Sequence, residues 1–139
     1  MTVLRGERVT LRPWRDDDLA PFAALNDDPE VMQHLSGRLS REDSDAMVAR
    51  IREHFDRHGF GLWALDVPGL GFAGFVGLSA QVPFEIGVPG IEPHPHEIGW
   101  RLARAAWGHG YATEAATLAL RHALAPLHLP QAVSSTVPA

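Results

Sequence analysis

The sequence contains no cysteine among its 139 residues, which excludes disulfide bonds, thiolate metal sites and a cysteine nucleophile. It also lacks long apolar runs: residues 1–15 hold none, and no later stretch approaches the roughly 20 residues that a membrane span needs. The basic excess of a general phosphate-backbone binder is absent too, since the net charge is −5. We therefore expect a cytoplasmic chain that binds neither membranes nor nucleic acids.

Hydrophobic residues make up 45% of the chain, enough for a single domain over residues 1–139. Alternating apolar and polar positions predict a strand at 9–12. Capping residues followed by apolar positions at helical spacing predict three helices. These begin after Asp16 or Asp17, at Asp28-Pro29, and at Ser40, the last running to about Arg57.

The apolar pattern changes to short runs after Gly59, which supplies the stop for the third helix. We predict a hairpin of strands 60–65 and 72–79 around a turn at 66–69, and then a proline-rich loop at 81–95. The remaining predicted elements are a strand at 96–102, a helix at 111–125, a connector at 126–130 and a strand at 131–137. This order predicts a mixed α/β layered domain.

The most informative segment is Trp107-Gly108-His109-Gly110-Tyr111-Ala112-Thr113, two closely spaced glycines between a strand and a helix. Glycine permits backbone conformations in which successive N–H groups point into one concavity, and a helix N-terminus adds further free N–H groups. Such a turn suits a phosphate-bearing ligand, although plain chain reversal also explains it. It is neither a dinucleotide fingerprint, since the third glycine is missing, nor a Walker loop, since no Lys-Ser or Lys-Thr follows.

The wider frame, from His96-Glu97-Ile98-Gly99-Trp100 through Glu114-Ala115, resembles the acyl-CoA pyrophosphate loop of the GNAT acyltransferases. Two N-terminal stretches, Leu11 to Leu19 and Leu25 to Met32, resemble the branch that includes the ribosomal-protein N-terminal acetyltransferases. The resemblance implies a mostly antiparallel central sheet with helices on both faces. It also implies acetyl-CoA as cofactor and an amine as acceptor: a protein N-terminus, a small amine or an amino acid.

The resemblance further places the pyrophosphate on backbone N–H groups of roughly Ala105 to Gly110 and of the helix start. It sets the pantetheine arm beside the preceding strand, where a backbone N–H stabilises the oxyanion. Arg104 either adds charge to the phosphates or is a solvated surface arginine. The residues expected to hold acetyl-CoA are Trp100, Arg101, Leu102, Arg104, Ala105, Trp107, Gly108, His109, Gly110, Tyr111, Ala112 and Thr113.

Glu97 is the candidate catalytic base, because on an extended strand it shares one face with Gly99 and Arg101. A carboxylate there can take a proton, through water, from an amine whose pKa is about 8 to 10. The alternative is a structural ion pair between Glu97 and Arg101 or another arginine. Tyr111, the only tyrosine, lies in the predicted phosphate loop and is poorly placed to protonate the leaving thiolate.

The histidine pairs 54/58 and 94/96 have spacings that permit metal chelation, but neither has an evident third ligand, so no metal site is expected. The GNAT relatives continue past residue 137 with a further helix and two strands. We therefore expect a domain that is incomplete at its C-terminal end. The explanations are a shortened or proteolysed chain, a frameshifted product, or completion by a partner chain in a homodimer. Two alternatives to an active enzyme remain: a catalytically silent acyl-CoA-binding or assembly domain, and a loop that binds another phosphate ligand or none.

Overall fold

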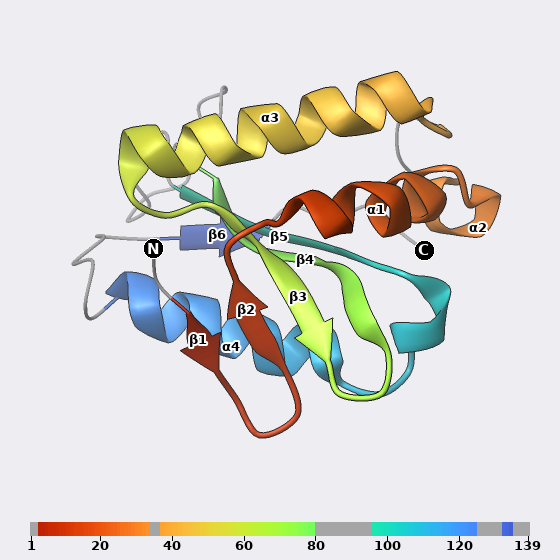
Figure 1. The fold of residues 1–139 in the computed structure, drawn as a ribbon. Coiled ribbons are helices and arrows are strands. Elements are labelled where there is room, and N and C mark those ends of the chain that lie inside the picture. Colours follow the sequence, from red (N-terminus) through yellow and green to blue (C-terminus); the bar gives the residue numbers. More distant parts are fainter. Residues whose placement is uncertain (1–2, 34–36, 80–95, 125–131, 135–139) are drawn as a thin grey trace.

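The strands of a single mixed sheet follow one another in space in the order in which they occur in the sequence (Figure 1). The computed structural model describes residues 3–33, 37–79, 96–124 and 132–134. Neighbouring strands are antiparallel except the last two, which run parallel. The strands are β1 (Leu4–Arg5), β2 (Thr10–Arg12), β3 (Leu62–Val67), β4 (Gly71–Ser79), β5 (His96–Leu102) and β6 (Ala132–Ser134).

Helices cover both faces of this sheet, with α1 and α3 on one side and α4 on the other (Figure 1). The helices are α1 (Leu19–Asn26), α2 (Pro29–Met32), α3 (Arg41–His58) and α4 (Tyr111–Leu124), with 3-10 turns at Asp16–Asp18 and Arg104–Ala106. The predicted mixed α/β class, with a mostly antiparallel sheet between helices, is confirmed. None of the described helices has the length and apolar character that crossing a membrane requires.

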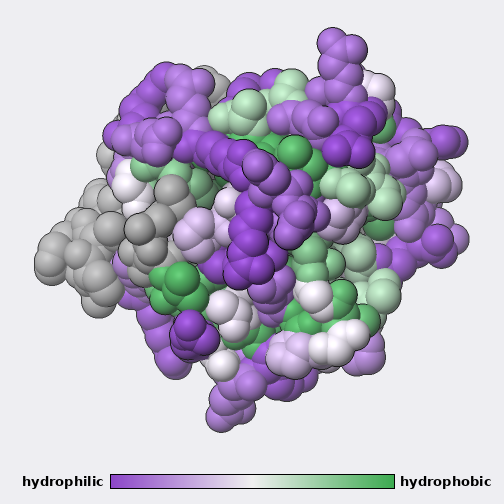
Figure 2. Space-filling view, in the orientation of Figure 1, coloured by the Kyte–Doolittle hydropathy of each residue, from purple (hydrophilic) through white to green (hydrophobic). Residues whose placement is uncertain are grey.

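The ends of α3 are set by local signals in the sequence. The Ser40 hydroxyl accepts a hydrogen bond from the Asp43 N–H at 3.1 Å, and Gly59 ends the helix with φ +77°. The buried positions recur every three or four residues and are Ser44, Val48, Ile51 and Phe55. The molecular face seen in Figure 2 is largely hydrophilic, with smaller apolar areas between. α3 is therefore amphipathic: its charged side chains face the solvent, and its apolar side chains cover one side of the core.

The other face of the sheet carries α4, which is rich in alanine. Ala115 and Ala119 are completely buried, whereas Ala112 and Ala116 are only partly buried. Alanines thus face the sheet at two of the most buried positions of the helix. Small side chains let this helix lie close to the sheet, which fixes the position of its N-terminus and of the glycine turn before it.

The hairpin and the first strands differ from the sequence prediction. β3 begins and ends two residues later than predicted, because Asp66 stays in the strand, where its carboxylate accepts from Arg12 Nε at 2.6 Å. β1 has only two residues and was not predicted. The predicted loop at 81–95, the connector at 126–130 and the outer parts of the strand at 131–137 lie outside the described residues.

Candidate functional site

A pocket of about 290 Å³ lies where β5 meets the glycine turn and the start of α4. Most of the residues predicted to hold the cofactor come together around it, joined by Ala106. The lining consists of Trp100, Leu102, Ala106, Trp107, Gly108, Gly110, Tyr111, Ala112 and Thr113. Gly108 and Gly110 have φ values of +76° and +77°, a region that side-chain-bearing residues rarely adopt. The turn therefore depends on both glycines.

Six consecutive backbone N–H groups at this pocket, those of residues 108–113, make no hydrogen bond to any described residue. The first N–H bond of the helix comes from Glu114, which donates to the Gly110 carbonyl at 3.1 Å. Unpaired N–H groups in a glycine turn and at a helix N-terminus attract anions through their partial positive charge. The arrangement supplies the donors that a pyrophosphate needs, so the residues present fit that group.

Two tryptophans form exposed apolar walls beside these donors. Trp100 is 42% exposed and Trp107 45% exposed, although both are large hydrophobic residues. The Trp107 indole N–H donates to the Leu102 carbonyl at 2.9 Å and so ties the turn to the end of β5. Exposed indoles at the mouth of a pocket are typical of a ligand-binding surface.

Arg8, from the loop between β1 and β2, fastens the turn from the other side. Its Nη1 donates to the His109 carbonyl at 2.7 Å, and its guanidinium lies over the Tyr111 ring at 5.1 Å. Its Nε and backbone N–H both donate to the Glu114 carboxylate. These hydrogen bonds, with that from the Arg8 backbone foremost, lower the pKa of Glu114. Sequence reasoning missed Arg8, because no spacing or motif links it to the turn.

Four predicted cofactor residues do not line the pocket with the others. Arg104 instead donates to Asp28 Oδ2 at 2.6 Å, so its side chain joins the turn before α4 to the start of α2. Ala105 is exposed on the 3-10 turn, and the exposed His109 stacks its ring on Tyr111 at 5.2 Å. The Arg101 side chain lies on the opposite face of β5, against α1 and α3.

β4 pairs with β5 from Glu97 to Leu102. On the other edge of β5, β6 pairs from His96 to Ile98. From Gly99 onward, no described strand pairs with that edge. Glu97 occupies the β5 position opposite Ser79, within the part of the strand that β6 pairs with.

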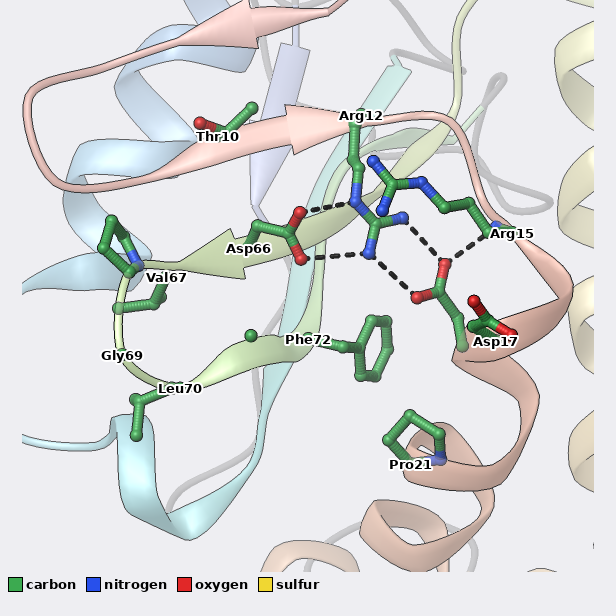
Figure 3. Close-up of a pocket in the computed structure, with 13 residues that line it drawn as sticks. Thr10, Arg12, Arg15, Asp17, Pro21, Asp66, Val67, Gly69, Leu70 and Phe72 are labelled. Atoms are coloured by element: carbon green, nitrogen blue, oxygen red, sulfur yellow. Dashed lines mark hydrogen bonds and ion pairs between the residues drawn. The ribbon is translucent and has the colours of Figure 1, made fainter.

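A larger hollow lies elsewhere, between the start of α1 and the β3–β4 turn (Figure 3). Arg12, 5% exposed, lies in it between the carboxylates of Asp66 and Asp18 (Figure 3). The hydrogen bonds to Asp18 raise the pKa of Arg12 and outweigh the opposing effect of burial. Burial acts to raise the pKa of Asp18, but the hydrogen bonds from Arg12 and from the Arg15 N–H outweigh it, so that this pKa is lowered. These charges satisfy one another, and the hollow offers a ligand little free chemistry.

Within the described ranges, no three histidine or acidic side chains lie close enough together to hold a metal ion. The rings of His54 and His58 approach to 4.5 Å, as their spacing on α3 suggests. They contact each other and Phe60, so the pair belongs to the packing at the end of that helix.

Comparison with known proteins identifies the fold. The family model described as "Acetyltransferase (GNAT) domain" matches residues 8–139. YkkB of Bacillus subtilis is 33% identical over 120 residues, which are 86% of this chain and 66% of YkkB; the chain thus spans slightly less than two-thirds of that relative's length. An acetyltransferase from Agrobacterium tumefaciens superposes with a TM-score of 0.82 at 26% identity, covering 99% of this chain and 75% of its own.

The ribosomal L7/L12 alpha-N-protein acetyltransferase RimL, solved in complex with coenzyme A, shares the fold at a TM-score of 0.72 and 14% identity. The superposition covers 95% of this chain and 73% of RimL. The match of the family model to nearly the whole chain, together with these neighbours, leads to one conclusion. This chain belongs to the GNAT family of acetyltransferases.

Proposed function

We propose that the chain transfers an acetyl group from acetyl-CoA to a primary amine, which attacks directly without a covalent enzyme intermediate. The observation that carries the proposal is the row of N–H groups at residues 108–113 that make no hydrogen bond to a described residue, beside a pocket with two exposed tryptophans. These groups bind the pyrophosphate without any cationic side chain in the pocket. The solved complex of RimL with coenzyme A supports the same use of this fold.

The edge of β5 from Gly99 onward, where no described strand pairs with it, holds the pantetheine arm as a neighbouring strand would. Acetyl-CoA supplies a thioester carbonyl and a thiol leaving group whose pKa is about 8.5. A backbone N–H near Trp100 to Leu102 stabilises the oxyanion, an interaction worth about 3 kcal/mol in comparable enzymes. Glu97 is the base that takes the amine proton through water. The acceptor is a protein N-terminus, a small amine or an amino acid.

Calorimetric titration of the 139-residue chain tests the cofactor site. Acetyl-CoA and desulfo-CoA should bind with similar micromolar affinity and ATP should not. Gly110→Val should abolish binding, because φ at this position is +77° and an added Cβ meets Arg8 Nη2 at 3.3 Å. Gly69→Val is the matched control: its φ is +88°, but it lies in the β3–β4 turn with nothing within 4 Å of a Cβ. Retained binding by the Gly110 variant contradicts the assignment.

Release of free thiol with a panel of amines tests the chemistry separately. Glu97→Gln should lower kcat about 100-fold or more, the usual contribution of a general base, with acetyl-CoA affinity unchanged. An unchanged rate removes Glu97 as the base. Tight acetyl-CoA binding without thiol release for any amine would instead identify the chain as an acyl-CoA-binding domain without catalytic activity.

A further inference from the structure

Arg101 is a cation held between the sheet and the helices on the face away from the pyrophosphate pocket. Its Nη1 donates to the Asn26 Oδ1 of α1 at 2.7 Å, and it approaches the Met47 sulfur of α3 at 3.9 Å. The guanidinium lies 5.3 Å from the centre of the Phe75 ring, its register partner on β4. All of these contacts are with uncharged groups.

The guanidinium forms no ion pair with any described residue. Its Nε is buried without a hydrogen-bond partner, and the described hydrogen bonds leave Nη2 unused as well. Burial lowers the pKa of Arg101, whereas the buried Arg12 has two carboxylate partners. Enclosing a cation without a counter-ion costs free energy. Nε and Nη2 together form the edge of the guanidinium that can donate two parallel hydrogen bonds to one carboxylate.

The neighbouring position on the same face of β5 is a glycine. Gly99 precedes Arg101 by two positions on β5 and therefore lies on the same face of the strand. A Cβ built at Gly99 meets nothing within 4 Å, and its register partner on β4 is also a glycine, Gly77. On this face of β5, the position next to Arg101 toward the proposed base therefore carries no side chain.

The position of Arg101 is itself fixed by a buried polar pair. Asn26 and Ser44 are both completely buried, and Asn26 Nδ2 donates to Ser44 Oγ at 3.0 Å. The amide oxygen of Asn26 is then oriented to receive Arg101 Nη1. Such support holds a binding side chain in one orientation before the ligand arrives.

We propose that Arg101 binds a carboxylate carried by the acceptor close to its amine, so that the substrates are amines with a neighbouring negative charge. This inference rests on the proposed function, because it assigns the acceptor of the same site. The carboxylate belongs either to a free amino acid or to an acidic residue at the N-terminus of a peptide. Both sources present the same group to Nε and Nη2.

Matched acceptor pairs test the proposal. L-leucine is compared with L-leucinamide, and a short peptide beginning with glutamate with the one beginning with glutamine. Binding is followed by saturation-transfer NMR with coenzyme A present, and acetylation by thiol release. The charged member of at least one pair should bind about tenfold more tightly, as expected for a charge-assisted pair, and that pair identifies the source. Equal binding of the members within both pairs overturns the proposal.

Arg101→Met should remove this preference by weakening only the charged member, and Arg101→Lys should restore part of it. Affinity for acetyl-CoA should not change, and Arg41→Met, on the exposed face of α3, is the control. Equal weakening of both members by Arg101→Met overturns the proposal and leaves a structural role. If the methionine variant does not fold, Gly99→Ala takes its place, since its Cβ enters open space and should weaken acceptor binding alone. If the proposed enzyme activity is wrong, no amine releases thiol. The NMR measurement of acceptor binding still tests the role of Arg101 in that case.

Discussion

Arg8 and Glu114, 106 residues apart in the sequence, are joined by two hydrogen bonds. Arg8 Nε donates to Glu114 Oε1 at 2.9 Å, and the Arg8 backbone N–H donates to Oε2 at 2.8 Å. Glu114 therefore belongs to another hollow, with Arg5, Gly6 and Glu7, and does not line the proposed pyrophosphate pocket. Its carboxylate attaches the β1–β2 loop to α4.

Arg8→Ala should weaken acetyl-CoA binding about threefold to fivefold, because the turn loses the support of its His109 carbonyl and its Tyr111 ring. The effect is modest since the Arg8 side chain is half exposed and its ion pair is screened by water. Calorimetric titration measures it. Arg41→Ala, which breaks an exposed pair on α3, should leave binding unchanged, and a double-mutant cycle with Glu114→Gln should show coupling. If the effects of the two substitutions on acetyl-CoA binding simply add, the Arg8–Glu114 ion pair does not support the turn.

The Arg12 cluster should be a main source of stability. Removing one partner leaves buried charges uncompensated, so Arg12→Met should lower the free energy of unfolding by about 3–5 kcal/mol. Arg52→Met, which breaks a pair with the 90% exposed side chain of Asp16, should cost less than about 1 kcal/mol. Urea unfolding followed by tryptophan fluorescence compares the two variants. Similar losses in both would show that burial does not amplify this ion pair.

These two clusters also mark the limit of prediction from the sequence. The bounds of α3 follow from neighbours along the chain, a serine cap and a terminal glycine, and the glycine turn is equally local. Nothing in the sequence pairs Arg8 with Glu114 or Arg12 with Asp66, because each pair forms only after the strands have taken their register. The two-residue shift of β3 has this cause: Asp66 resembles a turn residue until Arg12 is placed beside it.

The site shows the same division. Most of the residues predicted to hold the cofactor lie together around the pocket, because they come from two short neighbouring segments of the chain, the end of β5 and the glycine turn. The direction of each arginine side chain was not predictable: Arg104 extends to Asp28, the residue that caps α2, and Arg101 to Asn26 in α1. Hydrogen bonds from Arg104 lower the pKa of Asp28, which also caps α2 by accepting from the Glu30 N–H. A capping residue and an arginine that were interpreted separately in the sequence thus form one contact in the fold.

His122 should make stability depend on pH. Burial lowers the pKa of this side chain, which lies against the Trp63 ring at 5.7 Å. The unfolded chain then binds the proton more tightly than the folded one, so stability is full above about pH 6.5 and falls as the pH drops below it. His122→Leu should flatten the unfolding free energy between pH 7 and pH 5. The exposed His109, replaced by Leu, is the control, and an equal pH dependence in the His122 variant would contradict the assignment.

Gly74 connects the stability of the sheet to the site, because β4 passes here against the residue pair that ends β5. Its φ is +139°, and an added Cβ would lie 2.0 Å from the Arg101 carbonyl oxygen, which is backbone and cannot rotate away. Gly74→Ala therefore has to separate β4 from β5, and we expect a loss of at least about 3 kcal/mol, as for other severely strained sites. Gly71→Ala is matched to it, with φ +73° but open space around the Cβ, and should cost about 1 kcal/mol from conformation alone. Thermal unfolding ranks the two. If the Gly74 variant proves as stable as the Gly71 variant, the close approach of the two strands does not constrain the end of β5, and the position of Arg101 must be set by Asn26 alone.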